Sequence, residues 1–359
     1  MPTPVIDYLR ELVALSGPSG AEEDVIRAVA RLVRPLVDTV DLDSFGNLIA
    51  IRQGATPDAP RCAIAVHMDE IGFLVRKIED NGYLRFEKLG GSDNRVLLGQ
   101  RVWVRTGKGR LLGLIGTKSA HLLKEADRTS VPPHTEQYID IGARDRADAE
   151  RMGVRLGDAA GFVGELAELG LESGRYTAHA LDDRAGCAVL LAALDELRDQ
   201  PLPVTVIALF TTQEEVGLRG AQAAIKGQAA DAGLAIDTTA LDDTPETATD
   251  NLRLGAGPAV KIMDASTLAH PAVRRALVAA GEAAGVPIQH EALTGIGTDA
   301  GALQFGGSGM PTGTLSVGTR YTHSPIEVLD REDLEGAVRL LRGFLLALPD
   351  VDLRFTALD

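Results

Sequence analysis

Cysteine is scarce in this sequence, and so are aromatic residues. Only two of the 359 residues are cysteine, and one tryptophan, Trp103, stands among an aromatic content of 4%. Cys62 and Cys187 each lie in an apolar stretch, so we expect two buried free thiols rather than a disulfide. Free thiols suit a reducing compartment, which points to the cytoplasm. Few aromatic rings also disfavour a platform for sugar binding.

Basic residues are also fewer than acidic ones. Lysine and arginine together number 36 against 51 aspartate and glutamate residues, which leaves a net charge of -15. Nucleic acids and anionic membrane surfaces attract basic proteins, so this balance disfavours both as partners. No apolar run approaches the length that spans a bilayer, and the N-terminus lacks the pattern of a secretory signal. We therefore expect a cytoplasmic protein that binds neither nucleic acid nor membrane.

Length and apolar content, by contrast, are ample. A chain of 359 residues with 45% hydrophobic residues favours two domains. Strand-like and helix-like patterns alternate near both ends of the chain, which is typical of a sheet with helices on both faces. In the middle, short alternating segments and hairpin turns replace the helical periods. We predict an α/β domain made of residues 1–70 and 164–359 and a small β-rich domain, residues 71–163, inserted into it.

The individual elements follow from the same patterns. Apolar residues at a period of 3.6 indicate helices, and short apolar or alternating runs indicate strands. An acidic, polar stretch over 242–250 is expected to be an exposed loop. We expect strands over 40–42, 48–51, 62–66, 204–210 and 234–236, helices over 6–13, 25–33, 185–197, 220–229, 271–284 and 331–348, and strands of the insert over 73–78, 83–87, 102–104, 111–115 and 138–141.

Glu214 and Glu215 stand at the centre of the chemistry that the sequence suggests. They follow the apolar run 204–210, and the carboxyl end of a strand is the usual place for a site in an open α/β sheet. Adjacent carboxylates repel each other unless a cation or a shared proton relieves them. One solution is that one carboxylate binds a metal while the other serves as a base. The alternative is a solvated acidic loop.

Four further segments carry side chains that can bind metals: His67 with Asp69, Asp182, Asp237 and His323. Each segment could also have a purely structural role, because aspartate commonly caps helices or forms turns. Together, two imidazoles and several carboxylates suit a cation such as zinc or cobalt, and the lack of thiolates argues against a finger-type zinc site. The residues alone leave a carboxylate-rich metal enzyme and a protein without metal about equally open.

These segments resemble the signature set of metallopeptidase family 42, the family of the tetrahedral (TET) and glutamyl aminopeptidases. The segments occur in the same order, and the resemblance extends over essentially the whole chain. It is carried by His67-Met68-Asp69-Glu70-Ile71-Gly72, Asp182-Asp183-Arg184, Glu214-Glu215-Val216-Gly217, Asp237, Arg320-Tyr321-Thr322-His323-Ser324-Pro325, and by the shorter matches Phe45-Gly46-Asn47, Tyr138-Ile139-Asp140-Ile141-Gly142-Ala143 and Gly297-Thr298-Asp299-Ala300.

The resemblance implies a mixed sheet flanked by helices on both faces, of the zinc-peptidase type, with an inserted small β-barrel of PDZ-like form. It also implies two divalent metal ions per chain, zinc or cobalt. In that scheme His67 and Asp237 would hold one ion and Glu215 and His323 the other, while Asp182 would bridge the two.

The resemblance implies an activity as well. Glu214 would be the general base that activates water, Asp69 would orient His67, and the peptide bond between Asp182 and Asp183 would be cis. The reaction would be removal of N-terminal residues from short peptides. The inserted domain would mediate self-association into dimers and larger shells such as dodecamers.

Two other functions are weighed against this one. A glycoside hydrolase could use paired carboxylates, but the low aromatic content disfavours it. A non-catalytic relative would have kept the fold without the chemistry, although every position of the set retains a side chain able to bind metal. The acidic residues Asp242, Asp243 and Glu246 either belong to a solvated loop or favour substrates with a basic N-terminal residue.

Overall fold

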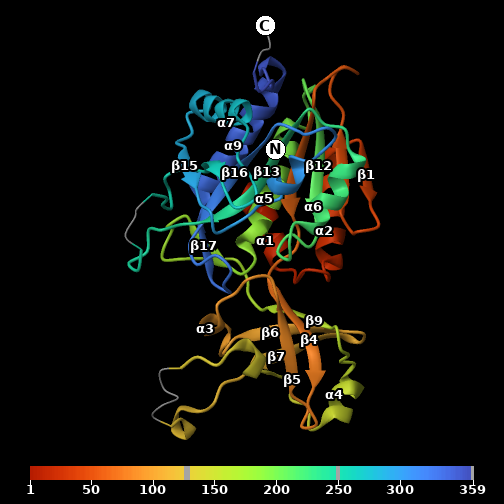
Figure 1. Cartoon of the computed structure of the whole chain (residues 1–359), viewed down its shortest axis with the longest axis vertical. Coiled ribbons are helices and arrows are strands. Elements are labelled where there is room, and N and C mark those ends of the chain that lie inside the picture. Colours follow the sequence, from red (N-terminus) through yellow and green to blue (C-terminus); the bar gives the residue numbers. More distant parts are fainter. Residues whose placement is uncertain (125–129, 248–250, 357–359) are drawn as a thin grey trace.

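The computed structural model describes residues 1–124, 130–247 and 251–356. Its larger part is built on an eight-stranded sheet in which β12, β3, β13 and β16 run parallel, while β2 and β14 pair antiparallel on either side of them (Figure 1). Parallel neighbours place their carboxyl ends at one edge of the sheet. In spatial order the strands are β1 (Thr39–Leu42), β2 (Leu48–Arg52), β12 (Thr205–Thr211), β3 (Arg61–His67), β13 (Ala232–Ala240), β16 (Thr312–Thr319), β14 (Ala259–Met263) and β15 (Gln289–Ala292).

Helices cover both faces of this sheet, and the residues of β3 show why. Successive side chains of a strand point to opposite faces. Ile64 and Val66 join a large core, and Ala63 and Ala65 join a smaller core on the other face. The large core includes α1 (Val5–Val13), α2 (Glu23–Val33), α5 (Leu181–Leu197), α7 (Pro271–Ala283) and α9 (Arg331–Ala347), and the smaller one includes α6 (Arg219–Ala224) and α8 (Ala300–Leu303).

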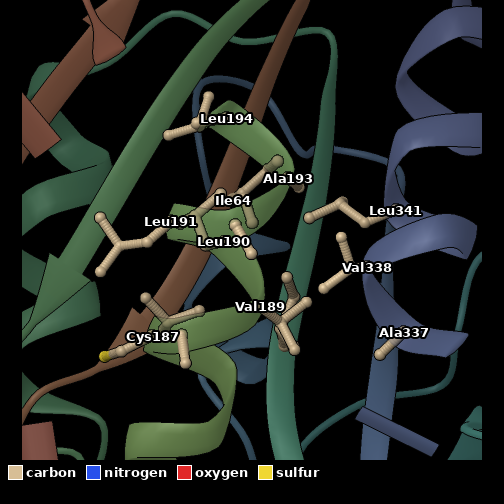
Figure 2. Close-up of a cluster of buried hydrophobic side chains, with 14 of the residues drawn as sticks. Ile64, Cys187, Val189, Leu190, Leu191, Ala193, Leu194, Ala337, Val338 and Leu341 are labelled. Atoms are coloured by element: carbon tan, nitrogen blue, oxygen red, sulfur yellow. The ribbon is translucent and has the colours of Figure 1, made fainter. Parts of the chain in front are cut away.

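Helix α5 lies at the centre of the large core. Figure 2 shows its side chains between Ile64 on β3 and the residues Val338 and Leu341 of α9. All but one of its residues are buried, Glu196 being the exception. A helix that is apolar on all sides must be enclosed by protein, and this enclosure fixes the position of its N-terminus at the sheet edge.

A closed barrel forms the second part of the molecule and lies at one end of it (Figure 1). It has its own core, in which the ring of Phe73 makes edge-to-face contacts with Phe86 at 4.8 Å and Phe162 at 5.3 Å between centroids. Its strands, in order around the barrel, are β4 (Gly72–Ile78), β5 (Leu84–Leu89), β8 (Ile139–Asp140), β7 (Gly109–Ile115), β6 (Arg101–Thr106) and β9 (Ala159–Phe162), with the helices α3 (Asn94–Leu97) and α4 (Arg146–Met152) beside them.

The remaining elements are short. A three-stranded sheet is formed by β10 (Ala167–Glu168), β11 (Arg175–Ala178) and β17 (Glu327–Asp330). Among the described residues the 3-10 helices are η1 (Arg34–Leu36), η2 (Ala120–Leu122), η4 (His134–Glu136), η5 (Ile225–Gly227) and η6 (Leu348–Asp350). Within the described ranges no helix has both the length and the apolar character needed to cross a bilayer.

The expected fold class is confirmed: the sheet is mixed, helices flank both faces, and a small barrel is inserted between β3 and β11. Both cysteines are free and buried, as expected. The helix expected over 220–229 is too long, since α6 ends at Ala224. The expected exposure of 242–250 is wrong for Asp242, Asp243 and Thr244, which are half-buried, and 248–250 lie outside the described residues. The exact domain boundaries stay a prediction.

Candidate active site

Five of the side chains named from the sequence meet at the carboxyl edge of the parallel strands. His67 is the last residue of β3, Asp237 lies in β13, and Asp182 lies in the first turn of α5. Glu215 follows β12, and His323 lies in the loop between β16 and β17. All five line one cleft of about 480 Å³. The fold thus brings together residues that are far apart in the sequence.

The five side chains form two triads that share Asp182. In the first, His67 Nε2 lies 3.2 Å from Asp182 Oδ1 and 3.7 Å from Asp237 Oδ1. In the second, His323 Nε2 lies 3.4 Å from Asp182 Oδ2 and 3.2 Å from Glu215 Oε2. Within each triad the three candidate ligand atoms lie within 4.8 Å of one another. Asp182 turns one oxygen to each triad, as a bridging ligand does.

The electrostatics of the cleft favour added positive charge. Burial raises the pKa of Glu215 above its ordinary value and that of Asp237 to about 6. Burial alone would lower the pKa of His323, but the carboxylates of Glu215 and Asp182 raise it far above its ordinary value. Burial would raise the pKa of Asp182, but the imidazoles of His323 and His67 lower it. The carboxyls therefore depend on nearby cations to stay ionised.

The donor set fits two divalent cations. Each triad offers one imidazole nitrogen and two carboxylate oxygens, which are ligands that zinc and cobalt accept. Glu215 Oε1 is buried and has no hydrogen-bond partner among the described residues. A buried carboxylate oxygen without a partner is costly, and a cation would relieve that cost. The observed residues are consistent with the expected pair of ions.

Asp69 holds two parts of the site in place. Its backbone oxygen lies 3.1 Å from His67 Nδ1, nearer than its carboxylate, whose Oδ1 is 3.5 Å away. The carboxylate accepts hydrogen bonds from Ser19 Oγ at 2.6 Å and from the backbone nitrogens of Glu214 at 2.9 Å and Glu215 at 3.2 Å. Asp69 thus fixes the ring of His67 with its main chain and the Glu214-Glu215 segment with its side chain.

Glu214 lines the same cleft but belongs to neither triad. Burial raises the pKa of its carboxyl well above the ordinary value, and neighbouring carboxylates such as Asp237 and Asp299 add to this effect. The preceding residue, Gln213, has a left-handed backbone conformation with φ of 54°, which non-glycine residues seldom adopt. Glu22 Oε1 accepts a hydrogen bond from the backbone nitrogen of Gln213 at 3.1 Å and so holds this turn.

Glu327 is a supporting residue that the sequence analysis missed. Its Oε2 accepts a hydrogen bond from the backbone nitrogen of Asp182 at 3.0 Å, and its Oε1 accepts one from that of His323 at 2.7 Å. His323 also has a left-handed backbone, with φ of 62°. One buried carboxylate therefore links the bridging residue to a member of the second triad. The strand β17 has the sequence EVLD, and the acidic residue at its start was the available signal.

Other named residues lie around the cluster or away from it. The peptide bond between Asp182 and Asp183 is cis, as the resemblance implied, and Asp183 Oδ2 accepts a hydrogen bond from the backbone nitrogen of His67 at 3.3 Å.

Asp243 makes a two-point ion pair with Arg320 at 2.6 and 2.7 Å, so it is not available to select basic substrates. Glu246 is exposed and does not line the cleft.

Comparison with known proteins points to one family. The model of the M42 glutamyl aminopeptidase family matches residues 46–340. A glutamyl aminopeptidase from Lactococcus lactis is 33% identical over 347 residues, which is 96% of this chain and 95% of that protein. A solved aminopeptidase from the archaeon Desulfurococcus kamchatkensis is 40% identical with a TM-score of 0.90, covering 95% of this chain and 94% of that one.

Two further solved structures are informative. Pyrococcus horikoshii TET1 peptidase, described as able to assemble into a tetrahedron or a large octahedral shell, is 36% identical with a TM-score of 0.86, covering 95% of this chain and 99% of that one. A structure from Thermotoga maritima that carries the name endoglucanase is less similar, at 28% identity and a TM-score of 0.77, covering 94% of this chain and 96% of that one.

Proposed function

The chain belongs to the M42 glutamyl aminopeptidase family, and on that premise we propose that it is an aminopeptidase that uses two divalent metal ions to remove N-terminal residues from short peptides. The observation that carries this proposal is the pair of triads sharing Asp182 beside a carboxyl, Glu214, that belongs to neither. A site with cation ligands and a separate base is what hydrolysis by an activated water requires.

His67, Asp182 and Asp237 would hold one ion, and Asp182, Glu215 and His323 the other. Two bound divalent cations, zinc or cobalt, would polarise the scissile carbonyl and lower the pKa of a water, as such ions do in hydrolases. Asp69 and Glu327 keep these ligands in position through the hydrogen bonds described above.

Glu214 serves as the general base in this proposal. One of its carboxylate oxygens takes a proton from the attacking water and passes it to the nitrogen of the leaving amine. The carboxyl has to be ionised to take the proton, and the positive charge of two bound ions would favour that form. Burial raises its pKa, so that it can hold the proton until the second transfer. A zinc or cobalt ion also accepts a neutral amine nitrogen as a ligand, so binding of the free α-amine would favour substrates with an unblocked N-terminus.

The glycoside hydrolase alternative gains no support from the cleft. Sugar-binding sites commonly rely on aromatic platforms, yet the described residues that line this cleft include no phenylalanine, tyrosine or tryptophan. The structure named endoglucanase is also less similar to this chain than the aminopeptidase from D. kamchatkensis. We therefore retain peptide hydrolysis as the function.

We also propose that the chain self-associates through the barrel within residues 71–163, first into dimers and then into larger shells such as dodecamers. The similarity to P. horikoshii TET1 supports assembly in general. We place the enzyme in the cytoplasm, where its two buried thiols remain reduced. Sedimentation of the purified protein, with a barrel surface variant as the comparison, tests the proposed assembly.

Peptide hydrolysis tests the function directly. We expect free amino acids to be released from unblocked di- to tetrapeptides, the activity to disappear on chelation, and zinc or cobalt to restore it. N-acetylated versions of the same peptides should not be cleaved. Cleavage of the blocked peptides at a comparable rate, or activity that survives chelation, would overturn the proposal.

A further inference from the structure

The cleft has a second wall, and that wall carries no charged side chain. Beyond the two triads and Glu214, the described residues that line the cleft are glycines and six small or aliphatic residues: Leu218, Thr238, Thr239, Ala240, Ile296 and Thr322. Since the triads and Glu214 occupy the reacting end, the side chain of a substrate's N-terminal residue is left with this neutral wall.

Two of the three threonines of the wall use their hydroxyl groups in contacts within the protein. Thr239 Oγ1 donates to Glu291 Oε1 at 2.7 Å, and Thr322 Oγ1 lies 2.6 Å from Thr319 Oγ1. Thr238 Oγ1 is buried from solvent and has no hydrogen-bond partner among the described residues. The hydroxyls of Thr239 and Thr322 are therefore engaged within the protein, and much of the remaining surface of the wall consists of methyl and methylene groups.

Two ion pairs lie close to the wall. Behind Thr239, Lys261 Nζ lies 2.6 Å from Glu291 Oε1, and both side chains are fully buried. Beside the cleft, the guanidinium of Arg320 is held by both oxygens of Asp243. Neither pair leaves a cation or an anion free to meet a charged substrate side chain.

Resting on the proposed function, we propose that this site selects substrates whose N-terminal residue is neutral and aliphatic, such as leucine or methionine. An aliphatic side chain gains from burial against methyl groups. A glutamyl or lysyl side chain would lose its hydration without gaining a partner, which is costly. The specificity of this chain thus differs from the glutamyl preference in the name of the family.

A panel of aminoacyl-nitroanilides tests the proposal. With zinc or cobalt present, we expect kcat/KM for the leucyl substrate to exceed that for the glutamyl and lysyl substrates at least tenfold. Equal values, or a preference for either charged substrate, would overturn the inference and leave the aminopeptidase function standing. Hydrolysis of none of them by protein that has bound metal would instead count against the proposed function itself.

Binding of free amino acids gives a readout that needs no turnover. Calorimetric titration should give a dissociation constant for L-leucine at least tenfold below those of L-glutamate and L-lysine. Similar constants for all three, or tighter binding of a charged one, would contradict the proposal.

A single substitution in the wall should change the preference. Ile296 is half-buried in the cleft wall, and Ile296→Lys places a cation there. We expect the ratio of kcat/KM for the glutamyl over the leucyl substrate to rise at least tenfold. Leu171→Lys is the matched control, because Leu171 is fully exposed and does not line the cleft. An unchanged ratio in a folded Ile296→Lys protein would place the wall outside the specificity site.

Discussion

At the scale of single residues, Glu214 allows the proposed catalytic step to be tested separately from metal binding. It lines the cleft with the triads, but it contributes to neither. Glu214→Gln keeps the shape of the side chain and removes its ability to accept a proton. We expect kcat to fall by about 10²–10⁴-fold, the usual contribution of a general base, while the metal content stays unchanged.

Kinetics together with elemental analysis measures both quantities for Glu214→Gln. The neighbouring variant Glu215→Gln is the control, and it should lose metal as well as activity because Glu215 belongs to the second triad. A Glu214→Gln protein with normal kcat would rule out its role as the base.

Glu327 is the residue whose effect should appear in metal affinity. Its two oxygens accept hydrogen bonds from the backbone nitrogens of Asp182 and His323. Glutamine has one acceptor oxygen, so Glu327→Gln leaves one of these buried donors unpaired. Supporting residues of this kind commonly change metal affinity by about 10–100-fold, and we expect a loss in that range.

Titration of the metal-free protein with zinc measures the affinity of the Glu327→Gln variant. Glu335→Gln is a suitable control, because Glu335 is an exposed residue of α9 whose ion pair, with Arg331, is long at 3.8 Å. Equal affinities for the two variants would show that Glu327 does not position the ligands.

At the scale of elements, α9 is tied to the loop before β14 by one carboxyl group. Asp333, in the first turn of α9, accepts hydrogen bonds from the backbone nitrogens of Gly255 at 2.8 Å and Gly257 at 2.7 Å. Burial raises its pKa to about 6, above the value near 3.8 expected in the unfolded chain. The folded state therefore holds the proton more tightly than the unfolded state between these two values.

The stability of the fold should reflect this difference. As pH rises from about 4 to 6, Asp333 contributes progressively less, by up to about 3 kcal/mol, and the contribution is constant above pH 6. Asp333→Asn removes the titration. Urea unfolding of both proteins at several pH values should show the difference between their free energies of unfolding falling over this window. A constant difference from pH 4 to 7 would contradict the assignment.

The elements also show how far the sequence alone could lead. The strands β3 and β12 were predictable, because central strands buried on both faces read as continuous apolar runs. Strand β16 is just as buried, but its sequence, TGTLSVGT, is rich in threonine and glycine, and only the stretch 314–317 within it has a strand pattern. It is a central strand because it lies between β13 and β14 in the sheet. No pattern within its own residues indicates which strands it pairs with.

Some residues of the candidate site could likewise be predicted from the sequence, and others could not. Patterns in the sequence placed Glu214 and Glu215 at a strand end, but the grouping of ligands into two sets came from the resemblance to a family. The supporting carboxylates of Glu22 and Glu327 were not foreseen. Each accepts a hydrogen bond from a backbone nitrogen of a distant segment, and a contact of that kind leaves no spacing pattern in the sequence.

At the scale of the whole molecule, the site concentrates negative charge in a protein that already carries a net charge of -15. Without cations, the buried carboxyls of the two triads repel one another and favour the unfolded chain. Ligands that bind only the folded state stabilise it, by about 4 kcal/mol for each site at a thousand times the dissociation constant. Removal of metal should therefore weaken the fold as well as the activity.

Calorimetric melting before and after treatment with a chelator measures this effect. For a domain of this size, each kcal/mol corresponds to about 2–4 °C in Tm, so we expect a fall of several degrees that added zinc reverses. The double variant Asp237→Asn with His323→Ala disrupts both triads, and its Tm should not respond to the chelator. If the unaltered protein kept its Tm after complete removal of metal, the clustered carboxyls would be stable without cations. That result would contradict the proposal that bound metal ions stabilise the folded state.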